Sequence, residues 1–247
     1  MNSSNTRGKK TFSEHFVELK SRVFQVGIIY SIVFCISYYF SEMIYFFAAK
    51  PLIEVLGKQT HFIYTGLTEA FFTHLALAGK FGIVIIMPII IFHLYRFIEP
   101  GLYEKEKSLV RLLAISSPIL FFLGMLFVYF FVMPKAFEFF ISFQANTNNY
   151  SLNLEAKINE YISLFTSLLL SFGIAFQLPI FILTLVSMDL INAENLSSKR
   201  RFAILLIFII AGIITPPDVI SQLLLAFPLM GLYEITIIVA RKIESRR

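Results

Sequence analysis

The chain has 247 residues, of which 57% are hydrophobic and 15% are charged, and its mean hydropathy is +0.76. This composition is typical of an integral membrane protein and excludes an ordinary soluble domain. The net charge of +5 comes from basic residues that flank apolar runs rather than form a stripe, so we expect no nucleic-acid partner. A single cysteine excludes a disulfide framework, and four scattered histidines have no metal-ligand spacing, so we expect no metal and no cofactor.

An amphipathic stretch precedes the first apolar run. The stretch Thr11 to Arg22 is predicted to be a helix, because apolar residues recur at helical spacing and form one stripe, namely Phe12, Phe16, Leu19 and Val23. Glu14 and Glu18 lie four residues apart on another face. This acidic face is typical of a solvated helix with a Glu18–Arg22 pair, and the alternative is a surface for a basic partner.

Six apolar runs follow, and we expect each to span a membrane. Their ranges are 23–40, 71–95, 112–133, 161–188, 202–214 and 219–240. The fifth run gives a helix of only about 20 Å, against a hydrocarbon core of about 30 Å. The sequence therefore predicts an all-α membrane protein with a single domain over residues 1–247 and one markedly short span.

Basic residues are concentrated on one side of these spans. Sixteen of the 21 lysines and arginines lie in the N-terminal segment, the connections after the second and fourth spans, and the C-terminal tail. Four lie in the alternate connections, and Lys80 lies inside a span. The positive-inside rule then places both termini, with the segment 1–22, in the cytoplasm or its organellar equivalent.

Two features on the opposite side predict local structure. The connection 41–70 is too apolar for a plain linker, and residues such as Phe46 and Phe47 fit a short helix lying on the membrane face. Pro216 and Pro217 end the fifth helix, and we expect Asp218 to cap the sixth, where its charge suits the helix dipole.

Polar residues in unexpected places are the candidates for function. The connection after the second span holds three acids, including Glu106, where lysine and arginine usually dominate. Pro179 should kink the fourth span and free a carbonyl, and Gln177 could bond that backbone, a neighbouring helix or a bound peptide. Contact between helices is the commoner role for such an amide. Lys80 lies in an apolar run and must face protein or water.

No reactive constellation is present. The sequence has no nucleophile with a base and an orienting group, no phosphate-binding glycine loop and no paired carboxylates in one pocket, so we expect no catalytic residue and no enzyme. A small-solute or ion transporter that uses Lys80, Gln177 and Asp218 as a polar pathway remains an alternative, as does a scaffold for assembling membrane proteins.

Several segments, in this order, resemble the TatC family, the multi-span receptor subunit of the twin-arginine (Sec-independent) protein translocase. They are residues 15–22, 50–53, 97–103 with Glu106, 172–179, and 215–218 with Ser221-Gln222, Pro228-Leu229 and Leu232-Tyr233-Glu234. Each piece is weak alone, and the ordered set on six spans is specific.

The resemblance implies a glove-like, concave arrangement of six helices whose last two are short. It implies binding of twin-arginine signal peptides by the N-terminal segment and first cytoplasmic loop, which corresponds to Glu18, Lys20, Phe97 and Glu106 here. Arginine needs carboxylate partners, so the two acidic segments become one site.

Two further groups of residues follow from the same likeness. Gln177 and Lys80 would make polar contacts inside the membrane. Structural roles in the outer hairpins fall to Pro51, Pro216, Pro217 and Asp218.

The implied partners are the signal peptides of folded cargo proteins, TatA- and TatB-type single-span subunits, membrane lipid and further copies of the chain. Transport would be driven by the proton-motive force across a bacterial or mitochondrial inner membrane. The chain departs from the family at Gln177, where glutamate is usual, and at Lys20, where arginine is usual. A hydrogen-bonding role at Gln177 is therefore expected in place of a charged one.

Overall fold

The computed structural model describes residues 12–56, 62–98, 104–143, 145–147, 150–152, 156–214 and 219–245. Most of these residues are helical. The helices are α1 (Phe12–Tyr39), α2 (Ser41–Leu56), α3 (Glu69–Ile98), α4 (Glu104–Phe127), a π-helical segment (Val128–Val132), α5 (Met133–Ile141), α6 (Ile158–Ala175), α7 (Leu178–Ser187), α8 (Ala193–Ser198), α9 (Arg200–Ile214) and α10 (Val219–Glu244).

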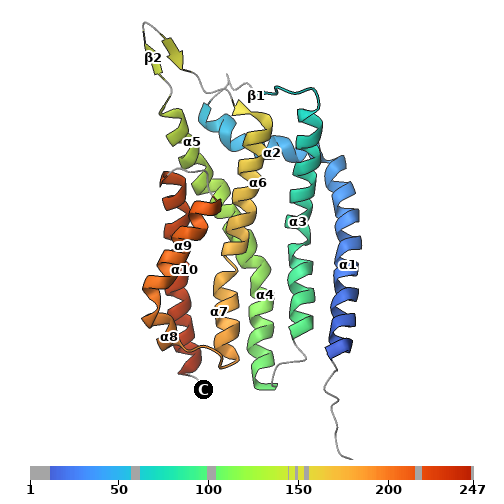
Figure 1. Ribbon diagram of the computed structural model, residues 1–247, viewed down its shortest axis with the longest axis vertical. Helices are drawn as coiled ribbons and strands as arrows, with labels where there is room; N and C mark the ends of the chain where they lie inside the picture. The colour runs from blue at the N-terminus through green and yellow to red at the C-terminus, as the bar shows by residue number, and fades with distance from the viewer. Residues whose placement is uncertain are drawn as a thin grey trace, which may run out of the picture.

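The long helices run side by side between two ends of a bundle (Figure 1). We call the end where α1 begins and α10 finishes the terminal end, and the opposite end the hairpin end. At the hairpin end α2 lies across the bundle, so the connection 41–70 contains the helix that the sequence predicted. Both described chain ends therefore lie on one side, which agrees with an even number of crossings.

Among the described residues, five helical segments are long and apolar enough to cross a membrane: 16–39, 69–97, 107–141, 158–187 and 222–244. The fifth apolar run of the sequence forms α9, whose 15 residues extend about 22 Å. It is a distinct helix but falls short of an ordinary span. The predicted N-terminal helix and the first apolar run are one continuous helix, α1.

Two small strand pairs were not expected. β1 (Phe62–Ile63) pairs in parallel with β4 (Ala156–Lys157), and β2 (Ala145–Thr147) pairs antiparallel with β3 (Tyr150–Leu152). Runs of two or three residues carry no periodicity, so the sequence could not reveal them. They occupy the hairpin end only and leave the helical class of the fold unchanged.

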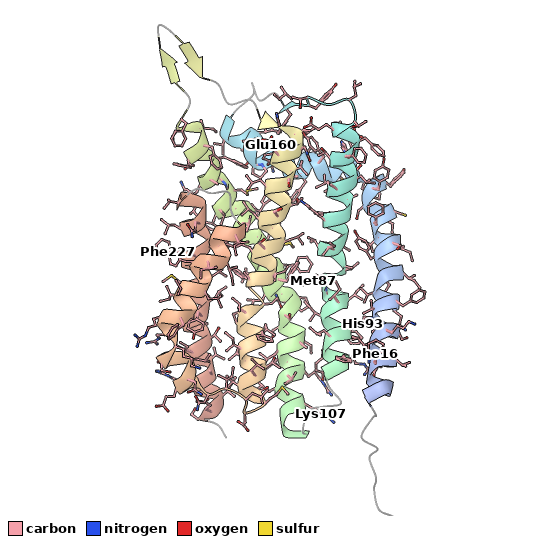
Figure 2. All side chains as sticks on the ribbon, viewed as in Figure 1. Phe16, Met87, His93, Lys107, Glu160 and Phe227 are labelled. Atoms are coloured by element: carbon pink, nitrogen blue, oxygen red, sulfur yellow. The ribbon has the colours of Figure 1, made fainter. Side chains whose placement is uncertain are left out.

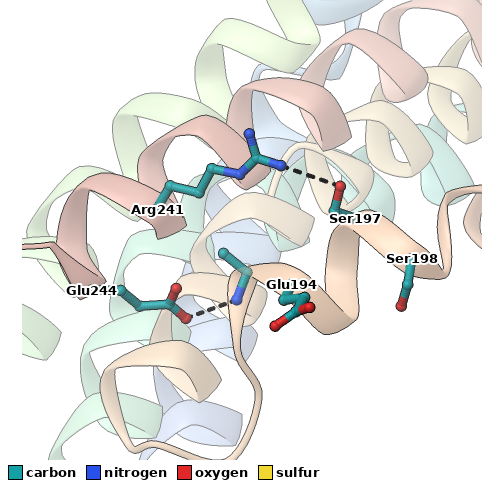
Figure 3. A pocket seen from close by; sticks show the side chains of 6 residues that line it. Glu194, Ser197, Ser198, Arg241 and Glu244 are labelled. Carbon is teal, nitrogen blue, oxygen red and sulfur yellow. Dashed lines mark hydrogen bonds between the residues drawn. The ribbon is translucent and has the colours of Figure 1, made fainter.

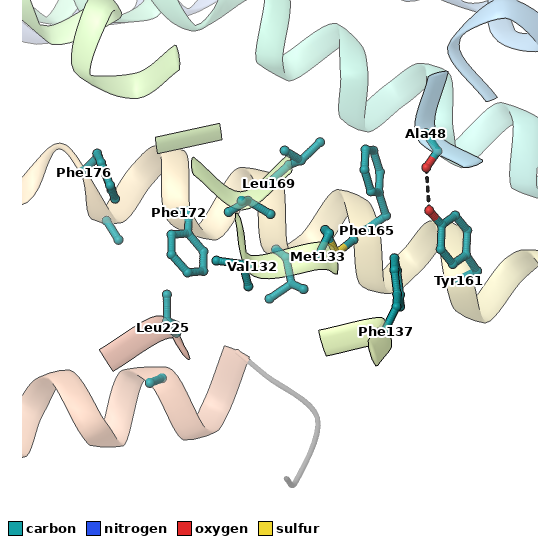
Figure 4. Close-up of a cluster of buried hydrophobic side chains, with 14 of the residues drawn as sticks. Ala48, Val132, Met133, Phe137, Tyr161, Phe165, Leu169, Phe172, Phe176 and Leu225 are labelled. Atoms are coloured by element: carbon teal, nitrogen blue, oxygen red, sulfur yellow. Dashed lines mark hydrogen bonds between the residues drawn. The ribbon is translucent and has the colours of Figure 1, made fainter. Parts of the chain in front are cut away.

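The main core lies where α4 and α6 cross. Phe121 and Phe172 are fully buried there, and two glycines permit the close approach of the helices. A Cβ atom on Gly124 would lie 2.8 Å from the backbone oxygen of Phe172, and one on Gly173 would lie 2.5 Å from the Phe121 ring. Towards the hairpin end the core continues through Phe165 and neighbouring side chains (Figure 4).

Pro51 explains how α2 is attached. A proline inside a helix cannot donate to the carbonyl four residues earlier, which here belongs to Phe47. The Tyr129 hydroxyl donates to that oxygen at 3.2 Å, and the two rings stack with centroids 4.6 Å apart. The buried Tyr161 hydroxyl donates to the next carbonyl, that of Ala48, at 2.5 Å (Figure 4). Pro51 thus frees the Phe47 carbonyl for Tyr129, and the Tyr161 bond to Ala48 gives α2 a second attachment.

Candidate functional site

The predicted acidic face of the N-terminal segment lies at the terminal end. Glu18 accepts two bonds from Arg22 on its Oε1 atom, from Nε at 3.2 Å and from Nη2 at 2.5 Å. Arg22 Nη2 also reaches the backbone oxygen of Arg96, at the end of α3, at 3.4 Å. The sequence predicted the Glu18–Arg22 pair from the spacing of four residues. The link to α3 was not predictable, because it joins residues 74 positions apart.

This arrangement places a carboxylate beside the connection between α3 and α4. The Glu18 and Arg22 side chains are each about one-fifth exposed. A carboxylate has about four lone-pair positions on its two oxygens, so an ion pair within the helix leaves Glu18 with further capacity to accept bonds. The geometry therefore suits a cationic ligand that donates several hydrogen bonds.

The other predicted members of this site are placed unequally. Lys20 is exposed on α1, and Phe97 is half-buried in the last turn of α3. Glu106 lies in the first turn of α4, but its side chain is outside the described part of the structure, as is the loop 99–103. The lower ends of α1, α3 and α4 nevertheless lie together, where Figure 2 labels Phe16 and Lys107. A joint site of Glu18 and Glu106 stays a prediction.

Gln177 joins two helices at the break between α6 and α7. Its Nε2 atom donates to the backbone oxygen of Ser117 on α4 at 3.1 Å, and its Oε1 accepts from the Ser117 hydroxyl. Because the Gln177 backbone N–H bonds to Ile174, the Gly173 oxygen loses its usual helical donor. Gln177 Nε2 lies 3.5 Å from that oxygen. Pro179, near the start of α7, explains why the helix ends here.

Replacing Gln177 with glutamate is expected to destabilise this chain. An ionised carboxylate cannot donate to the Ser117 and Gly173 oxygens, so two bonds are lost and like partial charges face each other. We expect a loss of about 1–3 kcal/mol in thermal unfolding at pH 7. Protonation restores one donor, so the loss should shrink as the pH falls.

The matched control is Gln177→Met, which removes the amide without adding charge. It should unfold at a temperature between those of the wild type and Gln177→Glu. Equal stability of Gln177→Glu and the wild type at pH 7 would contradict the donor role of the amide.

Lys80 does not join Gln177 in a polar pair. It is half-buried on α3 and makes no hydrogen bond or ion pair with any described residue. The neighbouring Gly79 instead accepts a bond from the Tyr30 hydroxyl of α1 at 3.3 Å. The structure thus gives the two intramembrane candidates separate surroundings.

The two C-terminal helices, α9 and α10, are tied together near both ends of α9. The expectation that both would be short is wrong for α10, which has 26 residues, and holds for α9, which has 15. Pro216, Pro217 and Asp218 lie outside the described residues, between the end of α9 and the start of α10. Close to them Gln222 Nε2 donates to the Phe208 oxygen at 3.0 Å. Near the terminal end Arg200 on α9 pairs with Glu234 on α10 at 2.9 Å. The sequence did not predict this ion pair, which joins residues 34 positions apart.

A shallow pocket at the terminal end lies between α8 and α10 (Figure 3). The Glu244 carboxylate accepts a bond from the Ala193 N–H at 2.7 Å, and Arg241 donates to the Ser197 hydroxyl at 3.2 Å. These bonds attach the six-residue α8 to the end of α10. Their role is structural. Within the described ranges, no group of three or more His, Cys, Asp or Glu side chains could hold a metal ion.

Comparison with known proteins gives a consistent result. Residues 14–228 match the family model described as "Sec-independent protein translocase protein (TatC)". The chain is 47% identical to the protein of that name from Rickettsia prowazekii (strain Madrid E), over 96% of this chain and 95% of that protein. It is 38% identical to a tatC-like protein of Reclinomonas americana, over 94% and 87%. A crystal structure of the "Twin Arginine Translocase Receptor- TatC in DDM" superposes with a TM-score of 0.80 at 34% identity, covering 92% of this chain and 99% of that one.

Proposed function

Because the chain belongs to the TatC family of Sec-independent protein translocase proteins, we propose that it binds twin-arginine signal peptides of folded proteins. Members of this family are multi-pass membrane proteins that act in protein transport rather than as enzymes. The observation that carries the proposal is the Glu18 carboxylate, which Arg22 holds beside the end of α3. A guanidinium donates in a planar fork that fits a carboxylate, and two guanidiniums in sequence need two such acceptors.

In this proposal Glu18 and Glu106 accept the two arginines of the signal peptide. Phe97, half-buried where α3 ends, offers apolar contact to the residues that follow the arginine pair. Lys20 is exposed on the same helical segment as Glu18 and would repel a misplaced cation. The terminal end of the bundle then faces the cytoplasm or the mitochondrial matrix, where the concentration of basic residues belongs.

The partners and the energy source follow from the family. The chain would present a concave, glove-like face and organise TatA- and TatB-type single-span subunits and further copies of itself around the bound peptide. The proton-motive force across a bacterial or mitochondrial inner membrane would drive transport. The solute-transporter alternative needs Lys80, Gln177 and Asp218 on one pathway. Gln177 bonds to α4 instead, so no observation favours that alternative.

The test compares two peptides that differ only in donor geometry. The full chain in lipid nanodiscs should bind a fluorescent signal peptide with paired arginines about tenfold or more tightly than the same peptide with paired lysines, because lysine retains the charge but loses the bidentate fork. Fluorescence anisotropy measures both affinities. Equal binding of the two peptides would refute the proposed recognition, and flux of a small solute through protein-loaded liposomes would support the transporter instead.

A further inference from the structure

A groove lies between α3 and α4 near the terminal end, beside the proposed peptide site but without its residues. Its volume is about 520 Å³. The lining residues are Pro88, Phe92, Tyr95, Arg96, Arg111, Ala114, Ile115 and Pro118. Neither Glu18 nor Lys20 contributes, so the groove is a separate feature that the peptide proposal does not use.

Two prolines shape the inner part of this groove. Pro88 interrupts the bonding of α3 and Pro118 that of α4. Ala114, one turn before Pro118, also lines the groove and adds only a methyl group. The helices therefore part over a length where larger side chains would otherwise fill the space.

Two guanidiniums stand at the outer part of the groove. Arg96 lies over the Phe92 ring with its central carbon 5.9 Å from the centroid, and Arg111 Nε donates to the Tyr95 hydroxyl at 3.4 Å. Eight residues separate Arg96 from Pro88, so the prolines lie about 12 Å deeper along the helix. The groove is thus cationic at the membrane surface and apolar towards the bilayer interior.

A second hollow adjoins the first on α4. It has a volume of about 480 Å³ and is lined by Ser108, Leu109, Arg111, Leu112 and Ile115. Arg111 and Ile115 belong to both hollows. The Arg111 side chain therefore stands between two apolar furrows, and the Ser108 hydroxyl adds a donor and acceptor beside it.

We propose that this double groove binds an anionic phospholipid, with the phosphate between Arg96 and Arg111 and one acyl chain in each furrow. Basic pockets between helices on this side of a membrane suit anionic headgroups, and arginine binds phosphate through paired bonds. The charge of the groove selects the occupant. A peptide with two arginines would meet two more guanidiniums here and be repelled.

The direct test is native mass spectrometry of the full chain with two lipids of identical acyl chains. Wild type should retain phosphatidylglycerol more strongly than phosphatidylcholine. Arg96→Gln with Arg111→Gln should weaken phosphatidylglycerol binding about tenfold or more and leave phosphatidylcholine unchanged. Ala114→Phe, which fills the furrow without changing charge, should weaken both lipids. Soluble glycerol phosphate at the same concentration should not displace the lipid, because it lacks the acyl chains.

The matched control removes two charges from the same membrane side, away from the groove. Lys199→Gln with Arg201→Gln should bind phosphatidylglycerol as the wild type does. Equal binding of the two lipids to the wild type, or an equal loss in the control, would overturn the proposal. The proposal would also be overturned if the groove variant still bound phosphatidylglycerol but no longer bound a twin-arginine peptide, because the groove would then be a peptide site. A thermal melting curve of each variant checks that it is folded. If one variant unfolds, the comparison of phosphatidylglycerol with phosphatidylcholine on the wild type still tests the proposal.

Discussion

Replacing Glu18 and Glu106 together by glutamine is expected to lower the affinity for a twin-arginine signal peptide about a hundredfold or more. Each carboxylate would lose a charge-assisted, bidentate bond to an arginine, and such bonds contribute about 1.5–3 kcal/mol each. Glutamine keeps the size and one acceptor oxygen, so the loss reports charge and geometry rather than packing. Crosslinking of a photoreactive signal peptide to the full chain in membranes, with anisotropy in nanodiscs, measures the effect.

Two controls separate recognition from local structure. Glu194→Gln removes an acid from the terminal end on α8, away from the proposed site, and should leave binding unchanged. Arg22→Gln removes the internal partner of Glu18 and should weaken peptide binding less than Glu18→Gln does, because the carboxylate keeps its charge and loses only the contact that holds it beside α3. A loss with Arg22→Gln as large as with Glu18→Gln would mean that the ion pair only stabilises α1.

Adding a single methyl group at the crossing of α4 and α6 is expected to be the most damaging small change in the membrane core. In Gly173→Ala the new Cβ would meet the fully buried Phe121 ring at 2.5 Å, and in Gly124→Ala it would meet the Phe172 backbone oxygen at 2.8 Å. Neither neighbour can swing into solvent. We expect each substitution to lower the free energy of unfolding by about 1–3 kcal/mol, as overpacking does elsewhere.

Two other glycines provide controls in which alanine should raise, rather than lower, the free energy of unfolding. A Cβ on Gly27 or Gly231 would meet no atom within 4 Å, although both residues lie inside helices. Alanine there should raise stability by about 0.5–1 kcal/mol through its better helix propensity. Thermal unfolding in one detergent compares all four variants. A Gly173→Ala protein as stable as Gly27→Ala would show that the crossing is looser than described.

Structural features that depend on residues close together in the chain were predictable from the sequence. The spacing of Glu18 and Arg22 indicated their pair, Pro179 indicated the break between α6 and α7, and the apolar residues after Ser41 indicated the helix α2. These signals are local because helix periodicity, capping and proline chemistry act within one or two turns.

Features that join distant residues were not predictable in the same way. Gln177 had three candidate partners in the sequence, and only the fold brings Ser117 on α4 within reach of it. The ion pair between Arg200 and Glu234 likewise joins residues 34 positions apart, so the sequence did not indicate it. For the groove between α3 and α4, the sequence shows only that Arg96 and Arg111 lie on either side of one connection. The depth of the groove depends on how far the two kinked helices separate in the fold.

The π-helical segment between α4 and α5 has a consequence for which side chains face the core. Phe121 and Phe137 are both buried, yet 16 steps of about 100° in a regular α-helix would place them about 160° apart around the axis. A π-turn absorbs one extra residue and turns the later part back by about 100°, which brings the two rings to within roughly 60° of each other. The π-helical segment Val128–Val132 therefore keeps the buried side chains of α4 and α5 on nearly the same side of the helix axis. As a result α4 packs against α6, and α5, which continues it, packs against α2.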